Sequence, residues 1–224
     1  MDTLSLSARQ ELADRIRRRN PELSKKRILD AAQKAFAVKG FGGARLRDIA
    51  QEAGVHHALV HHYFCDKRGL FEEVLRRGLQ SVAMLSEMRV APGEPIYQTL
   101  EKMVDPLYDF FADNRDLLCA IEGALRDHEG VPFEVASSLL ATHFQPLVNQ
   151  LQVQIDAAQA RGEVRNDLSS RALLLYGLSA LMTPFFVGTG LSRTLGLPRP
   201  GSGVRAVAKA ELIALLNAAV APQG

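Results

Sequence analysis

Residues 46–64, LRDIAQEAGVHHALVHHYF, restrict the possible fold more than any other stretch of the chain. Apolar side chains repeat there at the three- and four-residue spacing of one helical face: Leu46, Ile49, Ala50 and Ala53. Gly54 follows, and glycine readily adopts the left-handed conformation that closes a helix. A second helical run then continues to Phe64. The pattern predicts a helix-turn-helix, which presents its second helix to the major groove of DNA.

Further elements on both sides of this stretch extend the pattern. The segment RILDAAQKAFAVKGF at 27–41 precedes it, and Lys67, Leu70 and Phe71 follow the HYF at 62–64. In this order the elements resemble the DNA-binding domain of the TetR family of bacterial transcriptional regulators, over about a quarter of the chain. The resemblance implies a three-helix DNA-binding domain, followed by a larger helical domain that binds a small effector and dimerises.

The resemblance also implies which residues meet DNA. His57, Ala58 and His61 are expected at base edges, where imidazole can donate, accept or stack. Arg45 stands where the family commonly has a capping Thr, and its guanidinium is expected at a phosphate instead. The full set of predicted DNA contacts is Arg45, His56, His57, Ala58, Leu59, His61, His62, Tyr63 and Lys67.

The histidines of the second helix admit two other interpretations. His57 and His61 are four residues apart, as are His61 and Cys65, which is the spacing of paired metal ligands on a helix. The family resemblance already accounts for this face, so we predict no metal and no other cofactor. The histidines could instead be satisfied core residues, but the polarity of the helix argues against that.

Charge is divided unevenly along the chain. Residues 1–78 contain 16 Lys or Arg and 10 Asp or Glu, which gives this segment a charge of +6. Residues 79–224 contain 11 Lys or Arg and 15 Asp or Glu, a charge of −4, so the net charge of the chain is +2. A basic N-terminal third fits contact with phosphates, although chance segregation of solvated charges would give the same balance. The arginine cluster within residues 1–20 is interpreted as a basic arm along DNA or, with slightly more weight, as a solvated tail.

Several classes of protein are disfavoured. The chain has no run of eighteen apolar residues and no apolar signal core at its start, so we expect a cytoplasmic protein without a membrane span. Cys65 and Cys119 fit a reducing compartment. Nothing resembles a Gly-rich phosphate loop, a nucleophile elbow or the inward Glu-x-x-His repeat of a di-iron bundle, so no enzyme is predicted.

The remaining chain predicts an all-α protein. The first helix is expected from Pro21 or Ser24, with Ser24 as the N-cap, to Lys39, and another from near Arg68 with Asp66 as its cap. Later helices are expected at 95–113, 115–128, 131–161, 169–188 and 203–219. The predicted organisation is a basic extension at 1–20, the helix-turn-helix domain at 21–68, and a ligand-binding and dimerisation domain at 69–224.

Family resemblance implies a largely apolar effector pocket among the middle helices. Large apolar side chains with few polar groups suit such a ligand, although each of them alone is better explained as core. The predicted ligand contacts are Tyr108, Phe111, Leu118, Glu122, Arg126, His143, Phe144 and Tyr176.

The last two predicted helices are apolar on nearly all sides and must therefore be buried. In the family such helices pair with their copies in a second subunit, and the resulting homodimer binds a near-palindromic double-stranded DNA operator. The predicted function is a repressor released from its operator by a small apolar effector. Two alternatives remain: an architectural DNA-binding protein without a small ligand, and a metal-sensing regulator that uses the His-rich helix.

Overall fold

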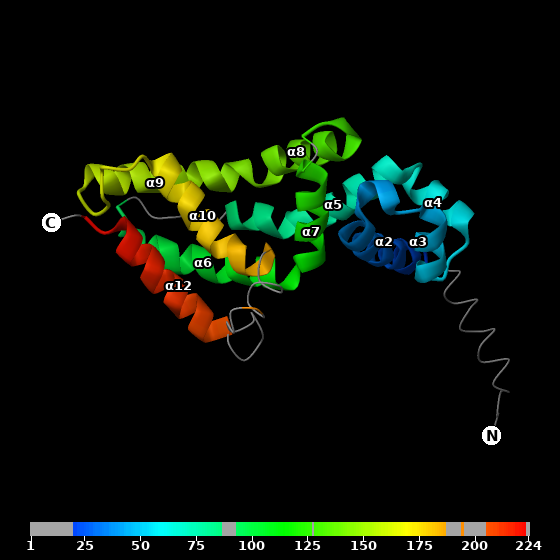
Figure 1. Cartoon of the computed structure of the whole chain (residues 1–224), viewed down its shortest axis with the longest axis horizontal. Helices are drawn as coiled ribbons and strands as arrows, with labels where there is room; N and C mark the ends of the chain where they lie inside the picture. The colour runs from blue at the N-terminus through cyan, green and yellow to red at the C-terminus, as the bar shows by residue number, and fades with distance from the viewer. Residues whose placement is uncertain (1–19, 87–92, 127, 187–193, 195–204, 223–224) are drawn as a thin grey trace, which may run out of the picture. The chain divides into compact units, whose positions relative to one another are not determined.

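The computed structural model describes residues 20–86, 93–126, 128–186, 194 and 205–222, and all regular structure within them is α-helical, as predicted (Figure 1). The arginine cluster at 15–19 lies outside these residues. The helices are α2 (Pro21–Gly43), α3 (Leu46–Ala53), α4 (His57–Phe64), α5 (Lys67–Ser86), α6 (Ile96–Asp113), α7 (Arg115–Leu125), α8 (Gly130–His143), α9 (Gln145–Ala160), α10 (Ser170–Phe186) and α12 (Arg205–Val220).

The chain forms two compact units, which are described separately. The first combines the described part of Met1–Arg77 with Cys119–Ala136, and the second combines Gly78–Leu118 with the described part of Ser137–Gly224. The helices α5, α7 and α8 each begin in one unit and end in the other. The predicted domain boundary at residue 68 stays a prediction. Within the described residues, no helix combines the length and apolarity that crossing a membrane requires.

The first unit begins with a capped helix. Asn20, not Ser24, is the N-cap of α2: its side-chain oxygen accepts a hydrogen bond from the amide of Leu23 at 3.1 Å. The prediction of Ser24 as the cap is wrong because Asn20 and Pro21 together form a better start, a strong capping residue followed by a proline that needs no amide partner. Ser24 is consequently a buried residue within the helix.

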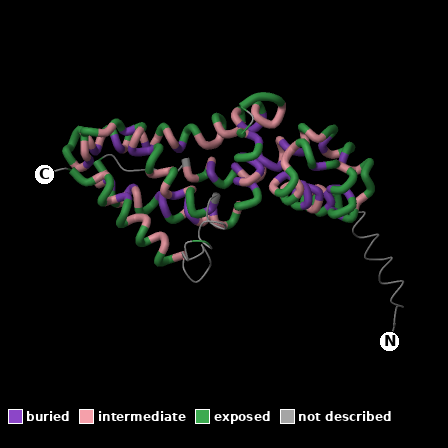
Figure 2. The backbone as a smooth tube through the Cα atoms, in the orientation of Figure 1, coloured by how far each residue is buried: buried purple, intermediate pink, exposed green. Residues whose placement is uncertain are grey.

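An aromatic cluster closes the core of the first unit. The ring of Phe71 in α5 meets the rings of Phe36 and Phe41 in α2 edge-on, with centroids 4.9 and 5.2 Å apart. Helix α3 packs on both α2 and α4, and Ile49 and Val60 are buried there (Figure 2). Phe36 and Phe71 each leave only 1% of their surface exposed, so α2 and α5 are tied together by full burial of large rings.

The second unit is a bundle in which α6, α9, α10 and α12 pack on one another. Its helix boundaries follow the predictions except at 131–161, where a single helix was expected. That prediction is wrong: α8 ends at His143 and α9 begins at Gln145, with Phe144 between them. Pro146 lies in the first turn of α9, where its missing amide proton costs nothing, and it would break the hydrogen bonds of a continuous helix.

A ladder of charges joins α12 to α6. Lys209 Nζ lies 2.9 Å from Asp109 Oδ2 and 3.5 Å from Asp105 Oδ1, and Arg205 Nη2 lies 2.7 Å from Asp113 Oδ1. Burial alone would lower the pKa of Lys209, but the hydrogen bond to Asp109 and the neighbouring carboxylates raise it. The carboxylates are spaced one turn apart on α6, so the ladder fixes the register of α12 along it.

The turn between α4 and α5 depends on Gly69. Asp66 is the predicted cap of α5, and its side-chain oxygen does accept from the amide of Gly69, at 2.8 Å. A Cβ atom at position 69 would lie 2.4 Å from the carbonyl oxygen of Phe64. That oxygen belongs to the backbone, so the contact cannot be relieved by rotating a side chain.

We therefore expect Gly69→Ala to lower the free energy of unfolding by about 1–3 kcal/mol, the usual cost of forcing atoms into a packed site. The matched control is Gly123→Ala in α7, where an added Cβ has nothing within 4 Å. That variant should gain about 0.5–1 kcal/mol from helix propensity. Urea unfolding followed by circular dichroism measures both, and equal effects of the two substitutions would contradict the steric account.

Candidate DNA-binding surface and internal cavity

The helix-turn-helix of the first unit has the predicted geometry. Helix α3 ends at Ala53, and Gly54 adopts the left-handed conformation with φ 62° and ψ 42°. The amide of Val55 then donates to the carbonyl of Ala50 at 3.0 Å, which closes the helix end. A Cβ on Gly54 would lie 2.4 Å from Nη2 of Arg27, which is the end of a flexible side chain and can move aside, so the left-handed conformation is what requires glycine here.

Helix α4 has one buried and one exposed face. Val60 and Phe64 are buried and anchor the helix to the unit. Four of the predicted base and phosphate contacts are exposed on the other side: His57, Ala58, His61 and His62. Leu59 and Tyr63 are half-buried between the two faces. The exposed face of α4 is therefore a polar strip of imidazoles (the imidazole strip), and the opposite face is anchored by its buried side chains.

Two histidines make hydrogen bonds that fix the ends of α4. His56 is its N-cap, and Nδ1 of His56 accepts from the amide of Ala58 at 3.3 Å. At the other end, Nδ1 of His61 lies 2.9 Å from the carbonyl oxygen of Cys65. A carbonyl only accepts, so Nδ1 of His61 carries the proton and Nε2 of the neutral ring is left as an acceptor on the exposed face.

Cys65 holds a strained turn directly after α4. Its φ of 61° and ψ of −61° are those of a three-residue γ-turn, closed by the amide of Asp66 donating to the carbonyl of Phe64 at 2.7 Å. Non-glycine residues rarely adopt this conformation, and it persists where neighbouring contacts determine it. The hydrogen bonds of His61 to Cys65 and of Gly69 to Asp66 supply those contacts.

The two predicted phosphate contacts beside α4 differ in how they are held. Arg45 is the N-cap residue of α3, is exposed, and makes no side-chain capping bond. Lys67 is half-buried: its Nζ donates to the carbonyl of Gly42 at 3.1 Å and lies 4.7 Å from the centre of the Phe41 ring. Burial lowers the pKa of Lys67. Lys67 thus ties the end of α2 to the start of α5, besides any contact with DNA.

The paired histidines do not gather further ligands for a metal. The rings of His57 and His61 meet edge-on with centroids 4.7 Å apart. Among the described residues, no three His, Cys, Asp or Glu side chains lie together as a metal site would need. The imidazole strip is thus organised by ring packing and by hydrogen bonds to the backbone.

Comparison with known proteins identifies the first unit. The sequence profile described as "Bacterial regulatory proteins, tetR family" matches residues 28–74, which run from α2 through α4 into α5. Residues 28–74 therefore carry a DNA-binding domain of the tetR type. The resemblance expected from the helix-turn-helix is thereby confirmed, and so is the all-α TetR fold.

Two curated TetR-family relatives extend the similarity. The HTH-type transcriptional repressor SCO4008 of Streptomyces coelicolor is 35% identical over 100 residues, 45% of this chain and 48% of the relative. The HTH-type transcriptional repressor NicS of Pseudomonas putida is 28% identical over 169 residues, 75% of this chain and 74% of the relative. This chain thus spans about half the length of SCO4008 and three quarters of NicS. Both relatives are regulators and not enzymes, as expected for this chain.

Solved TetR-family structures share the fold across both units. A HlyIIR mutant with residues 169–186 replaced by a linker gives a TM-score of 0.65 at 17% identity, covering 92% of this chain and 99% of that one. A tetR-family regulatory protein from Rhodococcus RHA1 gives a TM-score of 0.65 at 21% identity, and the match covers 90% of this chain and 98% of that one. At these identities the likeness shows the fold alone.

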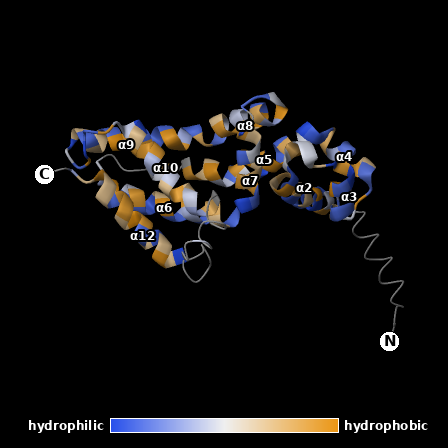
Figure 3. Cartoon of the chain, viewed as in Figure 1, coloured by the Kyte–Doolittle hydropathy of each residue, from blue (hydrophilic) through white to orange (hydrophobic). Residues whose placement is uncertain are grey.

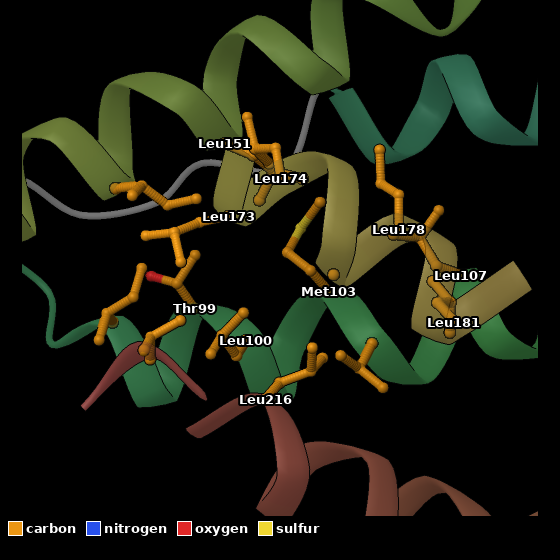
Figure 4. A pocket seen from close by; sticks show the side chains of 15 residues that line it. Thr99, Leu100, Met103, Leu107, Leu151, Leu173, Leu174, Leu178, Leu181 and Leu216 are labelled. Atoms are coloured by element: carbon orange, nitrogen blue, oxygen red, sulfur yellow. The ribbon is translucent and has the colours of Figure 1, made fainter. Parts of the chain in front are cut away.

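The second unit has a partly open apolar cavity of about 70 Å³ between α6, α9, α10 and α12 (Figure 4). Its lining residues are Ile96, Thr99, Leu100, Met103, Val104 and Leu107 of α6; Leu151 and Ile155 of α9; Leu173, Leu174, Gly177, Leu178 and Leu181 of α10; and Leu216 and Val220 of α12. Among the described residues that line it, Thr99 supplies the one polar side chain, and none of them is charged.

The predicted ligand contacts lie elsewhere. None of them lines this cavity. Tyr108 and Phe111 are buried against the ring of Phe185, with centroids 5.1 and 6.1 Å away, and burial raises the pKa of Tyr108. The other predicted contacts are dispersed: Leu118 is buried in α7, Glu122 and Arg126 form an exposed ion pair, His143 and Phe144 are half-buried between α8 and α9, and Tyr176 is exposed.

Sequence reasoning missed the cavity because its walls look like ordinary helix core. Leucines at helical spacing indicate burial, but they do not show which buried faces leave space between them. One available signal was Thr99, a hydroxyl among the apolar positions Ile96, Leu100 and Met103 of an amphipathic helix. A polar residue on the inward face of a helix is the exception that indicates a partner or a site.

The cap at the start of α4 can be tested directly. We expect His56→Ala to lower the free energy of unfolding by about 0.5–1 kcal/mol, the low end for loss of a capping side chain. The control is His56→Ser, because Ser is a stronger N-cap than Ala and should keep or raise stability. Thermal unfolding at neutral pH measures both variants. A His56→Ser protein as unstable as His56→Ala would mean that the imidazole is needed for something other than capping.

Proposed function

We propose that this TetR-family protein is a DNA-binding transcriptional regulator acting in the cytoplasm, and that it works as a homodimeric repressor which leaves its operator when a small apolar molecule binds the second unit. The observation that carries the proposal is the exposed imidazole strip of α4. Val60 and Phe64 hold that helix from behind, and Gly54 sets its angle to α3. This is the arrangement by which a helix-turn-helix places side chains in the major groove.

The exposed face of α4 suits base recognition by hydrogen bonds. With Nδ1 bonded to Cys65, the neutral ring of His61 offers Nε2 as an acceptor. Such an acceptor matches the amino groups of adenine and cytosine in the major groove. Arg45, which is exposed at the start of α3, supplies a guanidinium for the phosphate backbone. We accordingly assign His57, Ala58 and His61 to base edges, and Arg45, His62, Tyr63 and Lys67 to the backbone.

The decisive experiment is selection of random duplex DNA on the purified protein, followed by salt titration on the recovered sequence. A near-palindrome with half-sites about 34–36 Å apart is expected, because a two-fold dimer presents two copies of α4 one groove repeat apart. Sequence-independent, salt-sensitive binding alone would instead favour an architectural protein. Recovery of an operator only after zinc is added would favour a metal sensor.

Two substitutions separate base contacts from phosphate contacts. We expect His61→Ala to lose about 1–3 kcal/mol of specific binding and to relax discrimination at defined operator positions. Arg45→Ala should weaken binding to all sequences alike and reduce the slope of log affinity against log salt by about one. Fluorescence anisotropy on the operator and on scrambled duplexes, over a salt series, measures both. If Arg45→Ala altered base preference, or His61→Ala left it unchanged, these roles would be incorrectly assigned.

The proposed dimer interface is formed by the outer faces of α10 and α12. These helices pack on each other, and both are coloured largely as apolar in Figure 3. Four of their large apolar side chains remain 55–66% exposed in the single chain: Leu175, Tyr176, Val207 and Leu215. Small exposed residues such as Ser179 and Ala214 also lie on these helices, and small residues let helices approach closely. An apolar face of this kind on two adjacent helices fits a four-helix interface with a second copy.

We expect Leu215→Lys to raise the dissociation constant of the dimer by at least about tenfold, since the two-fold axis places two uncompensated charges in an apolar interface. The matched control is Val153→Lys. Val153 is 62% exposed on α9, outside the proposed interface, and its substitution should leave the dimer intact. Analytical ultracentrifugation over a concentration series measures both. Equal dimerisation of the two variants would place the interface elsewhere.

The cavity of the second unit is the proposed effector site. Helices α10 and α12 line it with Leu173, Leu181 and Leu216, and their other faces form the proposed dimer interface. A cavity of about 70 Å³ is smaller than the one of about 150 Å³ that admits benzene, so a ligand must displace part of the wall. Ligand and operator then favour different arrangements of the same helices, which couples their affinities reciprocally.

A further inference from the structure

Thr99 is a polar residue without a partner inside the cavity of the second unit. Its side chain is completely buried, with 0% of its surface exposed. Its hydroxyl oxygen Oγ1 makes no hydrogen bond within the described residues. Figure 4 shows the side chain of Thr99 and its oxygen among the residues that line the cavity. A buried hydroxyl without a partner is unfavourable, so its presence in an apolar wall requires an explanation.

A Ser or Thr hydroxyl within a helix usually donates a hydrogen bond to the carbonyl four residues earlier, and Thr99 makes no such bond. Other hydroxyls of the second unit bond back to a carbonyl four residues earlier: Thr142 to Ser138 at 2.9 Å, and Ser179 to Leu175 at 2.6 Å. For Thr99 that carbonyl is Pro95, which already accepts from the amides of Gln98 and Thr99 at 3.0 and 3.3 Å. Within the described part of the chain, the hydroxyl of Thr99 therefore has no partner.

The surroundings of Thr99 restrict the chemistry of that molecule. Of the lining residues that the structure describes, all others are apolar, and none carries a charge. A charged ligand group would lose its hydration there without a compensating partner. A threonine hydroxyl can both donate and accept, so it can bond an alcohol, a phenol or a carbonyl equally well. Met103, also in the wall, has a flexible side chain that adapts to different ligand shapes.

We propose that the cavity binds an uncharged, apolar molecule with one hydroxyl or carbonyl group, and that this group forms a hydrogen bond with Thr99 Oγ1. The inference rests on the proposed function, in which this cavity is the effector site. It makes Thr99 the residue that orients the ligand, with the polar group held at α6 and the apolar body between α10 and α12.

The test uses the full-length protein and two probes of nearly equal size, phenol and toluene. Titration calorimetry measures their affinities for the wild type, Thr99→Val and Thr99→Ser. We expect Thr99→Val to weaken phenol about tenfold, the effect of one hydrogen bond, while toluene changes less than twofold. Thr99→Ser keeps the hydroxyl and should keep the preference for phenol. Labelled methionine methyl groups, with Met103 assigned through Met103→Leu, show by NMR whether each probe occupies the cavity.

A second readout does not require a ligand. Valine has the shape of threonine without the hydroxyl, so Thr99→Val should raise the melting temperature of the free protein, because an unsatisfied buried group is removed. A lower melting temperature would mean that the hydroxyl has a partner in the free protein, such as a bound water molecule, and would overturn the proposal. It would also be overturned if Thr99→Val weakened both probes equally, or if neither probe bound the wild type at millimolar concentration.

These measurements contain no DNA, so their outcome is separable from that of the operator selection. Phenol binding that depends on Thr99, in a protein that selects no operator, would support the ligand site and reject the regulatory function. If the protein selected an operator but its cavity bound neither probe, the regulatory function would be supported and the ligand site rejected.

Discussion

Helix α4 carries the imidazole strip that we assign to DNA, and it has only eight residues. A helix this short does not persist in water by itself. Burial of Val60 and Phe64 against the first unit therefore has to supply its stability. Other contacts in that unit position the helices against which Val60 and Phe64 are buried. Gly54 sets the angle between α3 and α4, and the rings of Phe36, Phe41 and Phe71 hold α2 and α5 together.

Both ends of α4 are then fixed by its own histidines. His56 caps the first turn, and His61 bonds the carbonyl of Cys65 in the strained turn that leads into α5. In the proposed function His61 has two roles: Nδ1 bonds the carbonyl of Cys65 at the end of the helix, and Nε2 is assigned to a base edge. Because the backbone bond settles which nitrogen carries the proton in the neutral ring, local structure selects the kind of base edge that the ring can meet.

In the proposed function, a ligand must be able to displace helices of the second unit. Helices α10 and α12 contribute one face to the cavity and leave another apolar face exposed. A molecule that enlarged the cavity would therefore also change the proposed dimer surface. The ladder of Arg205 and Lys209 against the carboxylates of α6 restrains α12 from sliding along its axis. Outward displacement is resisted mainly by packing, which an apolar ligand can replace.

Much of the DNA-binding unit could be predicted from sequence because its determinants are local. The period of the apolar residues, Gly54 in the turn and Asp66 before α5 each act within a few residues, and family resemblance added the assignment of α4 as the DNA-facing helix. Local reasoning failed at Ser24, where Asn20 is a better cap, and at Phe144, where Pro146 starts a new helix.

The sequence by itself determined the all-α class, the helix-turn-helix and the apolar character of the last helices. Only the tertiary structure decided which inward faces leave a cavity, and hence that Thr99 borders it while Tyr108 and Phe111 pack against Phe185. It also decided that Lys67 bonds Gly42 and that Nδ1 of His61 is occupied by Cys65. The physical reason is that helix formation and capping depend on neighbours in sequence, whereas a void or a satisfied polar atom depends on how distant helices fit together.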